Sequence, residues 1–265
     1  MISLEAAASF GAPPACPPEV FTGNPRRSVS SNRGRSRVRR GVIFDLDETL
    51  YPRETFVRSG LAAVAKHVEG AHGIPADDAY NVMMRARAQG QQGVELQALS
   101  GRYDLSTRLT GDLVEVFRRH RPSLWLSHDV TATLQRLRRE GWHLAVLTNG
   151  LPSVQKGKVA ALHLERMVDH VIYAEDIVPG GKPSAGSFHA ALAKLRVQPQ
   201  QCVCVGDDPV CDIAGARAVG ISTIRLARPG IAPPAEAEAD LVVESLRDVP
   251  SAAASLLAQV TSDAI

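Results

Sequence analysis

The chain has 265 residues, of which 45% are hydrophobic and 22% are charged, and its formal net charge is +2. This composition is typical of a globular protein of one or two domains, and no apolar run approaches the roughly 18 residues that a membrane-spanning helix needs. Aromatic residues make up only 5% of the chain, too few to favour stacking on nucleic-acid bases. We therefore expect a soluble protein whose partners are neither membranes nor nucleic acids.

The first 40 residues differ from the rest of the chain. They contain seven arginines against Glu5 and Glu19, a charge of +5, together with five prolines and no sustained apolar period. Such a segment buries too little apolar surface to offset the entropy of ordering, so residues 1–40 are expected to form a disordered basic tail. A cytoplasmic protein is expected, and an organellar targeting peptide in this tail is the alternative.

The four cysteines lie at positions 16, 202, 204 and 211, without the paired spacing of a zinc site or a disulfide scaffold. A reducing compartment fits this pattern best. Cys202 and Cys204 alternate within an apolar run, which predicts that both are core residues.

From Gly41 onward, short β-branched or apolar runs alternate with segments of helical period. The runs predict strands at 41–44, 142–147, 171–173, 202–205, 222–226 and 241–243. The segments between them predict helices near 129–139, 153–162, 184–196 and 209–219. This alternation is typical of a sheet covered by helices on both faces, so the expected fold class is α/β with a doubly wound parallel sheet.

One connection is much longer than a strand–helix–strand crossover requires. Tyr51 and Trp142 are 91 positions apart, whereas about a dozen residues would suffice. The sequence between them shows no convincing strand and has helical patterns at 61–68, 77–88 and 105–119. We therefore expect a small helical domain at 55–122, inserted into a core made of 41–54 and 123–250.

The first predicted strand is followed by Asp45 and Asp47. Because a strand has a period of two, both side chains are expected on one side of the sheet's carboxyl edge, where open α/β sheets bind ligands. Two carboxylates at this spacing repel each other unless one is protonated or a cation lies between them. Oxygen ligands of this kind suit magnesium, so Mg²⁺ is the expected cofactor.

A second acidic cluster follows the predicted strand at 202–205. It contains Asp207, Asp208 and Asp212. If this strand neighbours the first one, Asp207 can supply another oxygen to the same cation.

Phosphate-binding groups follow two further strands. Thr148 and Asn149 end the strand that begins at Trp142, and their hydroxyl and amide could hold a phosphoryl oxygen. Lys182 follows the next strand and could neutralise a phosphate as a point charge. A threonine, an asparagine or a lysine alone is common at a turn or a helix cap. Because these residues follow successive strands, however, one shared site is favoured.

Together these motifs resemble those of the haloacid dehalogenase superfamily. Its four motifs are matched, in order, by Asp45–Thr49, Thr148–Asn149, Lys182–Pro183 and Gly206–Asp212. The resemblance covers about residues 41–228, and the inserted helices match the position of that family's helical cap. Within the superfamily, Thr148, Asn149 and Gly150 with Gln155 and Lys158 are similar to phosphatases that act on nucleotides or sugar phosphates.

The resemblance implies a phosphatase acting on a small phosphorylated metabolite through an aspartyl-phosphate. Asp45 would be the nucleophile, and Asp47 would be the acid and base, with a pKa that its neighbouring carboxylate raises. The metal shell would comprise an oxygen of Asp45, the backbone carbonyl of Asp47 and Asp207. Asp212 would support this shell, either as a metal ligand itself or by contacting the ligands, and Asp208 is a further supporting residue.

Other activities remain open at this point. A non-enzymatic phospho-acceptor of the receiver type also combines aspartates, a threonine and a lysine, but it needs neither the inserted helices nor Asp47. A dehalogenase or a phosphomutase of the same superfamily is a second alternative. Substrate choice is expected to reside in the insert, although its cations are expected to lie on solvated faces: Arg53, Arg58, Lys66, His67, Arg85 and Arg87.

Overall fold

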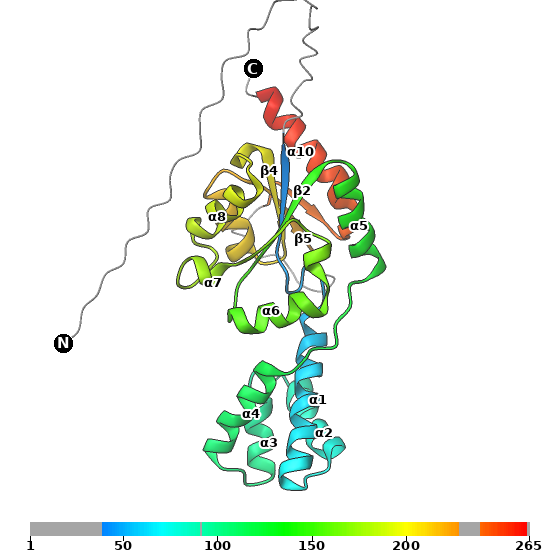
Figure 1. Ribbon diagram of the computed structural model, residues 1–265, viewed down its shortest axis with the longest axis vertical. Helices are drawn as coiled ribbons and strands as arrows, with labels where there is room; N and C mark the ends of the chain where they lie inside the picture. The colour runs from blue at the N-terminus through cyan, green and yellow to red at the C-terminus, as the bar shows by residue number, and fades with distance from the viewer. Residues whose placement is uncertain (1–38, 91, 228–238, 264–265) are drawn as a thin grey trace, which may run out of the picture. The chain divides into compact units, whose positions relative to one another are not determined.

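The computed structural model describes residues 39–90, 92–227 and 239–263, so the expected tail and Cys16 lie outside the described residues except for Arg39 and Arg40 (Figure 1). The described residues form a parallel sheet in the order β3-β2-β1-β4-β5-β6. Its strands are β1 (Arg40–Phe44), β2 (Trp142–Thr148), β3 (His170–Tyr173), β4 (Cys202–Gly206), β5 (Ser222–Leu226) and β6 (Leu241–Val243). The predicted α/β class with a doubly wound parallel sheet is confirmed.

The order of the strands determines which edge of the sheet can form a binding site. The chain builds β1, β2 and β3 outward and then returns to lay β4 on the other side of β1. The carboxyl ends of β1, β2 and β4 therefore flank the point where the order reverses, which is the ligand-binding crevice of open α/β sheets.

Strand β1 begins one residue earlier than the sequence predicted, at Arg40. The guanidinium of Arg40 lies 4.3 Å from the ring centroid of Trp142 and donates a hydrogen bond to the carbonyl oxygen of Glu140. Arg39 donates to the carbonyl oxygen of Leu195. These two arginines therefore contact the core, which the assignment of residues 1–40 to a tail did not anticipate.

Helices cover both faces of the sheet. On one face Val42 and Phe44 of β1 pack with α5 (His128–Arg139) and α10 (Val249–Asp263), and on the other Ile43 packs with α8 (Ala185–Leu195) (Figure 1). This alternation follows from the period of two in a strand. Helix α10 was not predicted because the expected core ended at residue 250, yet its apolar residues complete the first face: Ala253, Leu256 and Leu257.

The other elements of the core are short. They are α6 (Pro152–Ala161), η1 (Leu164–Arg166), α7 (Ala174–Ile177), η2 (Pro199–Gln201), α9 (Gly215–Arg217) and η4 (Leu246–Asp248). The predicted helix near 209–219 is divided, because its first part, η3 (Pro209–Ala214), is π-helical and only α9 is α-helical. Cys202 and Cys204 are buried and free, as predicted for core residues.

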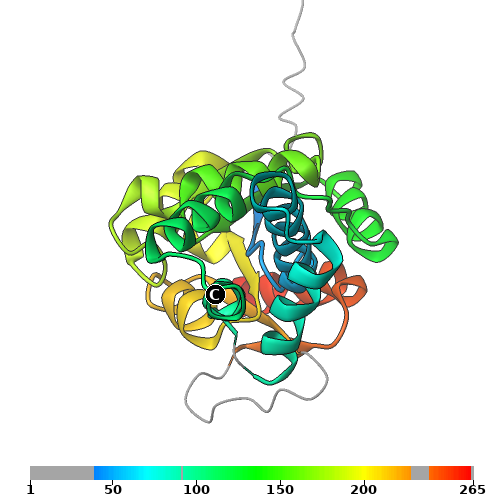
Figure 2. The ribbon, with the colours of Figure 1, turned by 90° about the horizontal axis from the view of Figure 1, so that it is seen from below.

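The long insertion folds into four helices with a core of their own. They are α1 (Arg53–His72), α2 (Ala76–Ala88), α3 (Glu95–Arg102) and α4 (Thr107–Arg119), grouped at one end of Figure 1 and seen from below in Figure 2. Helix α3 was not predicted. Buried apolar side chains pack between these helices: Leu61, Val64, Val68, Met83, Leu99 and Leu113. This helical region is consistent with a cap domain. Within the described ranges, no helix combines the length and the apolar character needed to cross a bilayer.

Candidate active site

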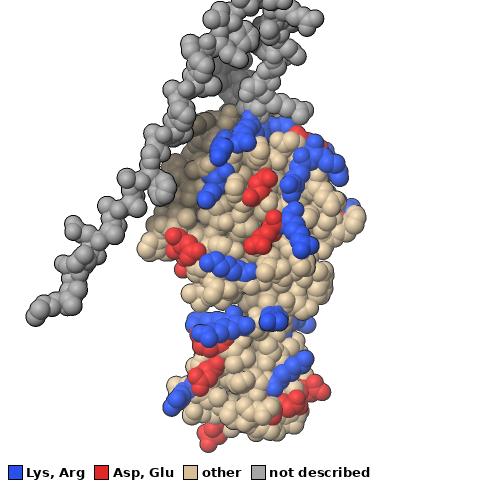
Figure 3. All heavy atoms as spheres, in the orientation of Figure 1, with Lys and Arg blue, Asp and Glu red and all other residues tan. Residues whose placement is uncertain are grey.

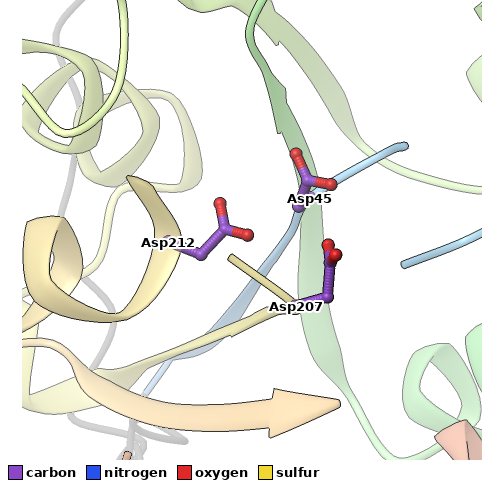
Figure 4. A group of neighbouring side chains, drawn as sticks. All are labelled: Asp45, Asp207 and Asp212. Carbon is purple, nitrogen blue, oxygen red and sulfur yellow. The ribbon is translucent and has the colours of Figure 1, made fainter. Parts of the chain in front are cut away.

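Three aspartates form an acidic cluster at the carboxyl edge of the sheet. Asp45 follows β1 and Asp207 follows β4, and these strands pair side by side, while Asp212 comes from η3. One carboxylate oxygen of each lies within 4.8 Å of the others, and Figure 4 shows the three carboxyl groups close together. Such an oxygen-only set can bind a metal ion. The side chain of Asp47 is not part of this cluster.

Lys182 joins two of these aspartates. Its Nζ lies 2.6 Å from Oδ1 of Asp45 and 2.7 Å from Oδ1 of Asp212, and all three residues are buried. Burial alone would lower the pKa of Lys182, but the two carboxylates outweigh burial and raise it, so the ammonium stays charged. Burial raises the pKa of Asp45 to about 7 even though Lys182 opposes the shift.

The end of β4 leaves space for Asp212. A Cβ atom at Gly206 would overlap the carboxyl group of Asp212, so a side chain at this position would displace that aspartate. Oδ2 of Asp212 accepts a hydrogen bond from the backbone N–H of Asp208 at 3.1 Å. Asp208 itself caps η3, because its Oδ1 accepts from the backbone N–H groups of Val210 and Cys211. Its role in the structure is therefore to hold the loop that carries Asp212.

Asn149 holds the loop that carries Lys182. Its Nδ2 donates to the carbonyl oxygen of Lys182 at 2.9 Å, and its Oδ1 accepts from the N–H of Lys182 at 2.8 Å. The preceding Gly181 has φ +61°, and a Cβ there would overlap Oδ1 of Asn149. The side-chain amide that we expected to face a phosphoryl oxygen is thus engaged with the protein backbone.

Asp47 lies beside the acidic cluster but has partners of its own. Its Oδ1 accepts from the hydroxyl of Tyr51 at 2.5 Å and from Nζ of Lys158 at 2.7 Å. Its Oδ2 accepts from Nζ of Lys158 at 2.8 Å and from Nε2 of Gln155 at 2.9 Å. Gln155 also donates to the hydroxyl of Thr148 at 2.5 Å, which links Asp47 to the end of β2.

The expectation that the pKa of Asp47 is raised is wrong for this site. Burial does favour the protonated carboxyl, but the ammonium of Lys158 and the hydrogen bonds from Lys158, Tyr51 and Gln155 outweigh burial and lower the pKa. The prediction considered Asp45, which is a neighbour in sequence, and missed a cation that lies 111 positions away. The resemblance pointed to Gln155 and Lys158 without a role, and nothing in the sequence singled out Tyr51.

Every predicted site residue lines a single cavity of about 920 Å³. Thr148, Asn149, Lys182 and the aspartates form its floor. Thr49 donates a hydrogen bond to Oδ1 of Asp207 at 3.1 Å. Helices α1–α4 contribute apolar and charged side chains: Phe56, Leu61, Leu96, Phe117, Arg53, Arg87 and Arg118. The cavity therefore combines a polar floor at the sheet edge with a wall from the helical region.

The cations of the helical region do not all lie on solvated faces. Charged side chains of both signs are interspersed on the face shown in Figure 3. Arg58 pairs with Glu54 as an exposed helical pair. Arg87, however, is only 15% exposed and forms ion pairs with both Glu54 and Glu95. It ties α2 to α1 and α3, which corrects the expectation for Arg87.

Comparison with known proteins identifies the family. A profile of the haloacid dehalogenase-like hydrolases matches residues 40–220. The chain belongs to this family. The sequence resemblance is thereby confirmed, and this hydrolase carries the family's helical insertion between β1 and β2.

Several curated relatives of this hydrolase are phosphatases, and the (S)-2-haloacid dehalogenase 4A of Burkholderia cepacia, 31% identical over 105 residues, is a relative of another activity. The phosphoserine phosphatase of Thermus thermophilus is 37% identical over 139 residues, which are 52% of this chain and 55% of that enzyme. The chain thus spans little more than half the length of that relative. The glyceraldehyde 3-phosphate phosphatase of Pyrococcus furiosus is 30% identical over 194 residues, 69% of this chain and 78% of that enzyme.

Solved structures share the fold of this hydrolase. The 2-haloacid dehalogenase of Pseudomonas syringae pv. Tomato has a TM-score of 0.58 at 26% identity, covering 84% of this chain and 99% of its own. The putative HAD-hydrolase YfnB of Bacillus subtilis, bound to magnesium, has a TM-score of 0.59 at 16% identity, covering 82% and 99%. At that identity the second comparison shows the fold alone.

Proposed function

We propose that this hydrolase is a magnesium-dependent phosphatase of a small phosphomonoester: a sugar phosphate, a nucleotide or a phosphorylated acid. The observation that carries the proposal is the contact of Lys182 with Asp45 beside the acidic cluster. Displacement at phosphorus needs a nucleophile together with positive charge that neutralises the phosphoryl group, and this site holds both. The phosphoserine and glyceraldehyde 3-phosphate phosphatases among the relatives support the same chemistry.

The acidic cluster fits Mg²⁺. Three carboxylates meet within 4.8 Å, which is more negative charge than the single ammonium of Lys182 offsets, and Mg²⁺ prefers oxygen ligands of this kind. Asp45, Asp207 and the backbone carbonyl of Asp47 would hold the ion. Asp212 would support these ligands through its hydrogen bond with Lys182, which also contacts Asp45. When bound, the ion would neutralise the phosphoryl oxygens and the attacking carboxylate.

Asp45 would act as the nucleophile. Its free carboxylate oxygen would attack phosphorus as the bond to the leaving oxygen breaks, which gives an aspartyl-phosphate and an alcohol. Lys182 would remain beside both reacting groups and oppose the negative charge that accumulates. Dividing one difficult displacement into two easier steps is the benefit of such a covalent intermediate.

Asp47 would move the protons. Its carboxyl would protonate the leaving alcohol, and its carboxylate would then take a proton from the water that attacks the aspartyl-phosphate, so Asp45 and Asp47 both return to their starting states. The ion pair with Lys158 favours the carboxylate form in the resting site. A dianionic phosphoryl group that enters beside Asp47 would favour the acid form that the first step requires.

Thr148, Asn149 and Lys182 would bind the phosphoryl group. The hydroxyl of Thr148 lies on the cavity floor, and Lys182 supplies the charge. Asn149 would act by fixing the backbone of Lys182, which is what its side-chain amide does here. Because these groups meet only the phosphoryl group, the wall from α1–α4 would determine which alcohol is accepted. A well-placed contact in such a wall is worth about 1–3 kcal/mol of discrimination between substrates.

Phosphate release tests the proposal. Purified protein is assayed with sugar phosphates, nucleotides and phosphorylated acids, first with Mg²⁺ and then with a chelator in its place. We expect many turnovers on at least one substrate with Mg²⁺ and none with the chelator, and we expect Asp45→Asn to abolish turnover while the protein stays folded. Full activity in the chelator would sink the mechanism, and normal turnover by the Asn variant would place the nucleophile elsewhere.

The same assay separates the alternatives. Stoichiometric uptake of phosphate without turnover would indicate a phospho-acceptor of the receiver type, and transfer of phosphate between sugar positions would indicate a mutase. Release of halide from a 2-haloacid would indicate a dehalogenase, the activity named for one structural neighbour. The carboxyl of Asp47 favours the phosphatase, because displacement of a halide needs no leaving-group protonation.

A further inference from the structure

Three side chains converge on the carboxylate of Asp47. Lys158 and Gln155 lie three positions apart on α6, so they share one face of that helix, and Tyr51 lies on the segment that follows β1. These three donors are 4%, 2% and 2% exposed, respectively. The group that they surround lines the cavity, with a side chain that is 21% exposed. A rigid buried frame thus holds a carboxylate that faces the substrate space.

The four hydrogen bonds leave this carboxylate little freedom. Each oxygen has two donors, because Oδ1 accepts from Tyr51 and Lys158, and Oδ2 accepts from Lys158 and Gln155. Rotation about the last side-chain bond of Asp47 would break at least two of them. The carboxylate therefore has a fixed plane as well as a fixed position.

The frame is itself anchored. Gln155 donates at the same time to the hydroxyl of Thr148, so it fixes the carboxylate of Asp47 relative to the end of β2. On the other side, Nζ of Lys158 lies 4.6 Å from the ring centroid of Phe56 in α1. That ring covers the ammonium with an apolar face, which strengthens its electrostatic contact with Asp47.

We propose that Lys158, with Gln155 and Tyr51, is a positioning residue that aims the carboxyl of Asp47 at the leaving-group oxygen, an inference that rests on the proposed phosphatase function. Proton transfer requires heavy atoms about 2.6–3.2 Å apart. A misplacement of about 1 Å costs about 10²-fold in rate. A pair that served stability alone would not need four bonds on a carboxylate that lines the cavity.

The test separates positioning from general damage through the leaving group. An alkyl phosphate needs protonation of its alcohol, whereas 4-nitrophenyl phosphate releases a stable phenolate and does not. The quantity to compare is kcat/KM, because it covers the steps up to formation of the aspartyl-phosphate and excludes its hydrolysis. For Lys158→Met we expect a loss of about 10²-fold on the alkyl phosphate that the wild type hydrolyses best, and a change of only a few-fold on 4-nitrophenyl phosphate.

Two further variants complete the experiment. Lys156→Met is the matched control, since Lys156 lies on the same helix with a side chain that is 57% exposed, and it should leave both substrates unchanged. Gln155→Met keeps the ion pair and removes one donor, so a smaller loss with the same selectivity is expected. It also carries the test if Lys158→Met fails to fold, which a melting curve would show.

The outcomes divide cleanly. An equal loss on both substrates, or no loss on the alkyl phosphate, overturns the positioning role and leaves the phosphatase function standing. A wild type that releases phosphate from no substrate overturns the proposed function itself and this inference with it.

Discussion

Replacing Lys182 by Met should destabilise the metal-free protein strongly. Met matches the length of the lysine stem but removes the ammonium that contacts both Asp45 and Asp212. Asp45 and Asp212 are 8% and 1% exposed, so water can offset only part of the lost positive charge. The variant therefore leaves two buried like charges next to each other.

The size of the effect follows from this geometry. Removing one partner of a buried ion pair costs about 3–5 kcal/mol. Asp45 limits the cost, because burial already raises its pKa to about 7 and it can take up a proton once Lys182 is gone. We therefore expect a loss near the lower end, about 3 kcal/mol, which lowers Tm by roughly 6–12 °C for a protein of this size.

The assay is thermal unfolding in a chelator and again with Mg²⁺. With Mg²⁺ the deficit should shrink, since a bound cation stabilises the folded state and offsets the same carboxylates. Combining Lys182→Met with Asp212→Asn should restore part of the loss, because only one buried carboxylate then remains. Activity should fall on all substrates together. A Tm in the chelator within about 2 °C of wild type would refute the reasoning, since it would mean that the ammonium offsets no buried charge.

Two further predictions concern the helical region and pH. Arg87→Met should lower the free energy of unfolding by about 2–3 kcal/mol, because Glu95, whose side chain is 8% exposed, loses its cation. Adding Glu95→Gln should recover part of this loss in denaturant titrations. An unchanged denaturation midpoint for Arg87→Met alone would contradict this prediction. In a chelator, Asp45→Asn should gain stability relative to wild type as the pH rises from about 4 to 7, because the folded wild type holds a proton there that its unfolded chain releases. A difference that stays flat with pH would show that burial does not raise the pKa of Asp45.

The sequence alone determined the architecture and the floor of the site. Short β-branched runs alternating with helical segments identify a parallel sheet, because strand and helix periods are local properties of the chain. Because parallel strands end at one edge of a sheet, the sequence also predicts that Asp45, Asp207, Thr148 and Lys182 lie together. Two helices were not predicted: α3, which has only eight residues, and α10, which lies beyond the expected end of the core at residue 250.

Only the tertiary structure decided which charges meet. The sign of the pKa shift at Asp47 depends on Lys158, 111 positions away, and the predicted sign was reversed because the neighbour in sequence is not the dominant neighbour in space. Likewise Arg87 reaches Glu54 across 33 positions, and the amide of Asn149 is engaged by the backbone of Lys182. Electrostatic free energies depend on distance and burial, which the sequence does not specify. The periodicity that defines strands and helices, in contrast, follows directly from the order of the residues.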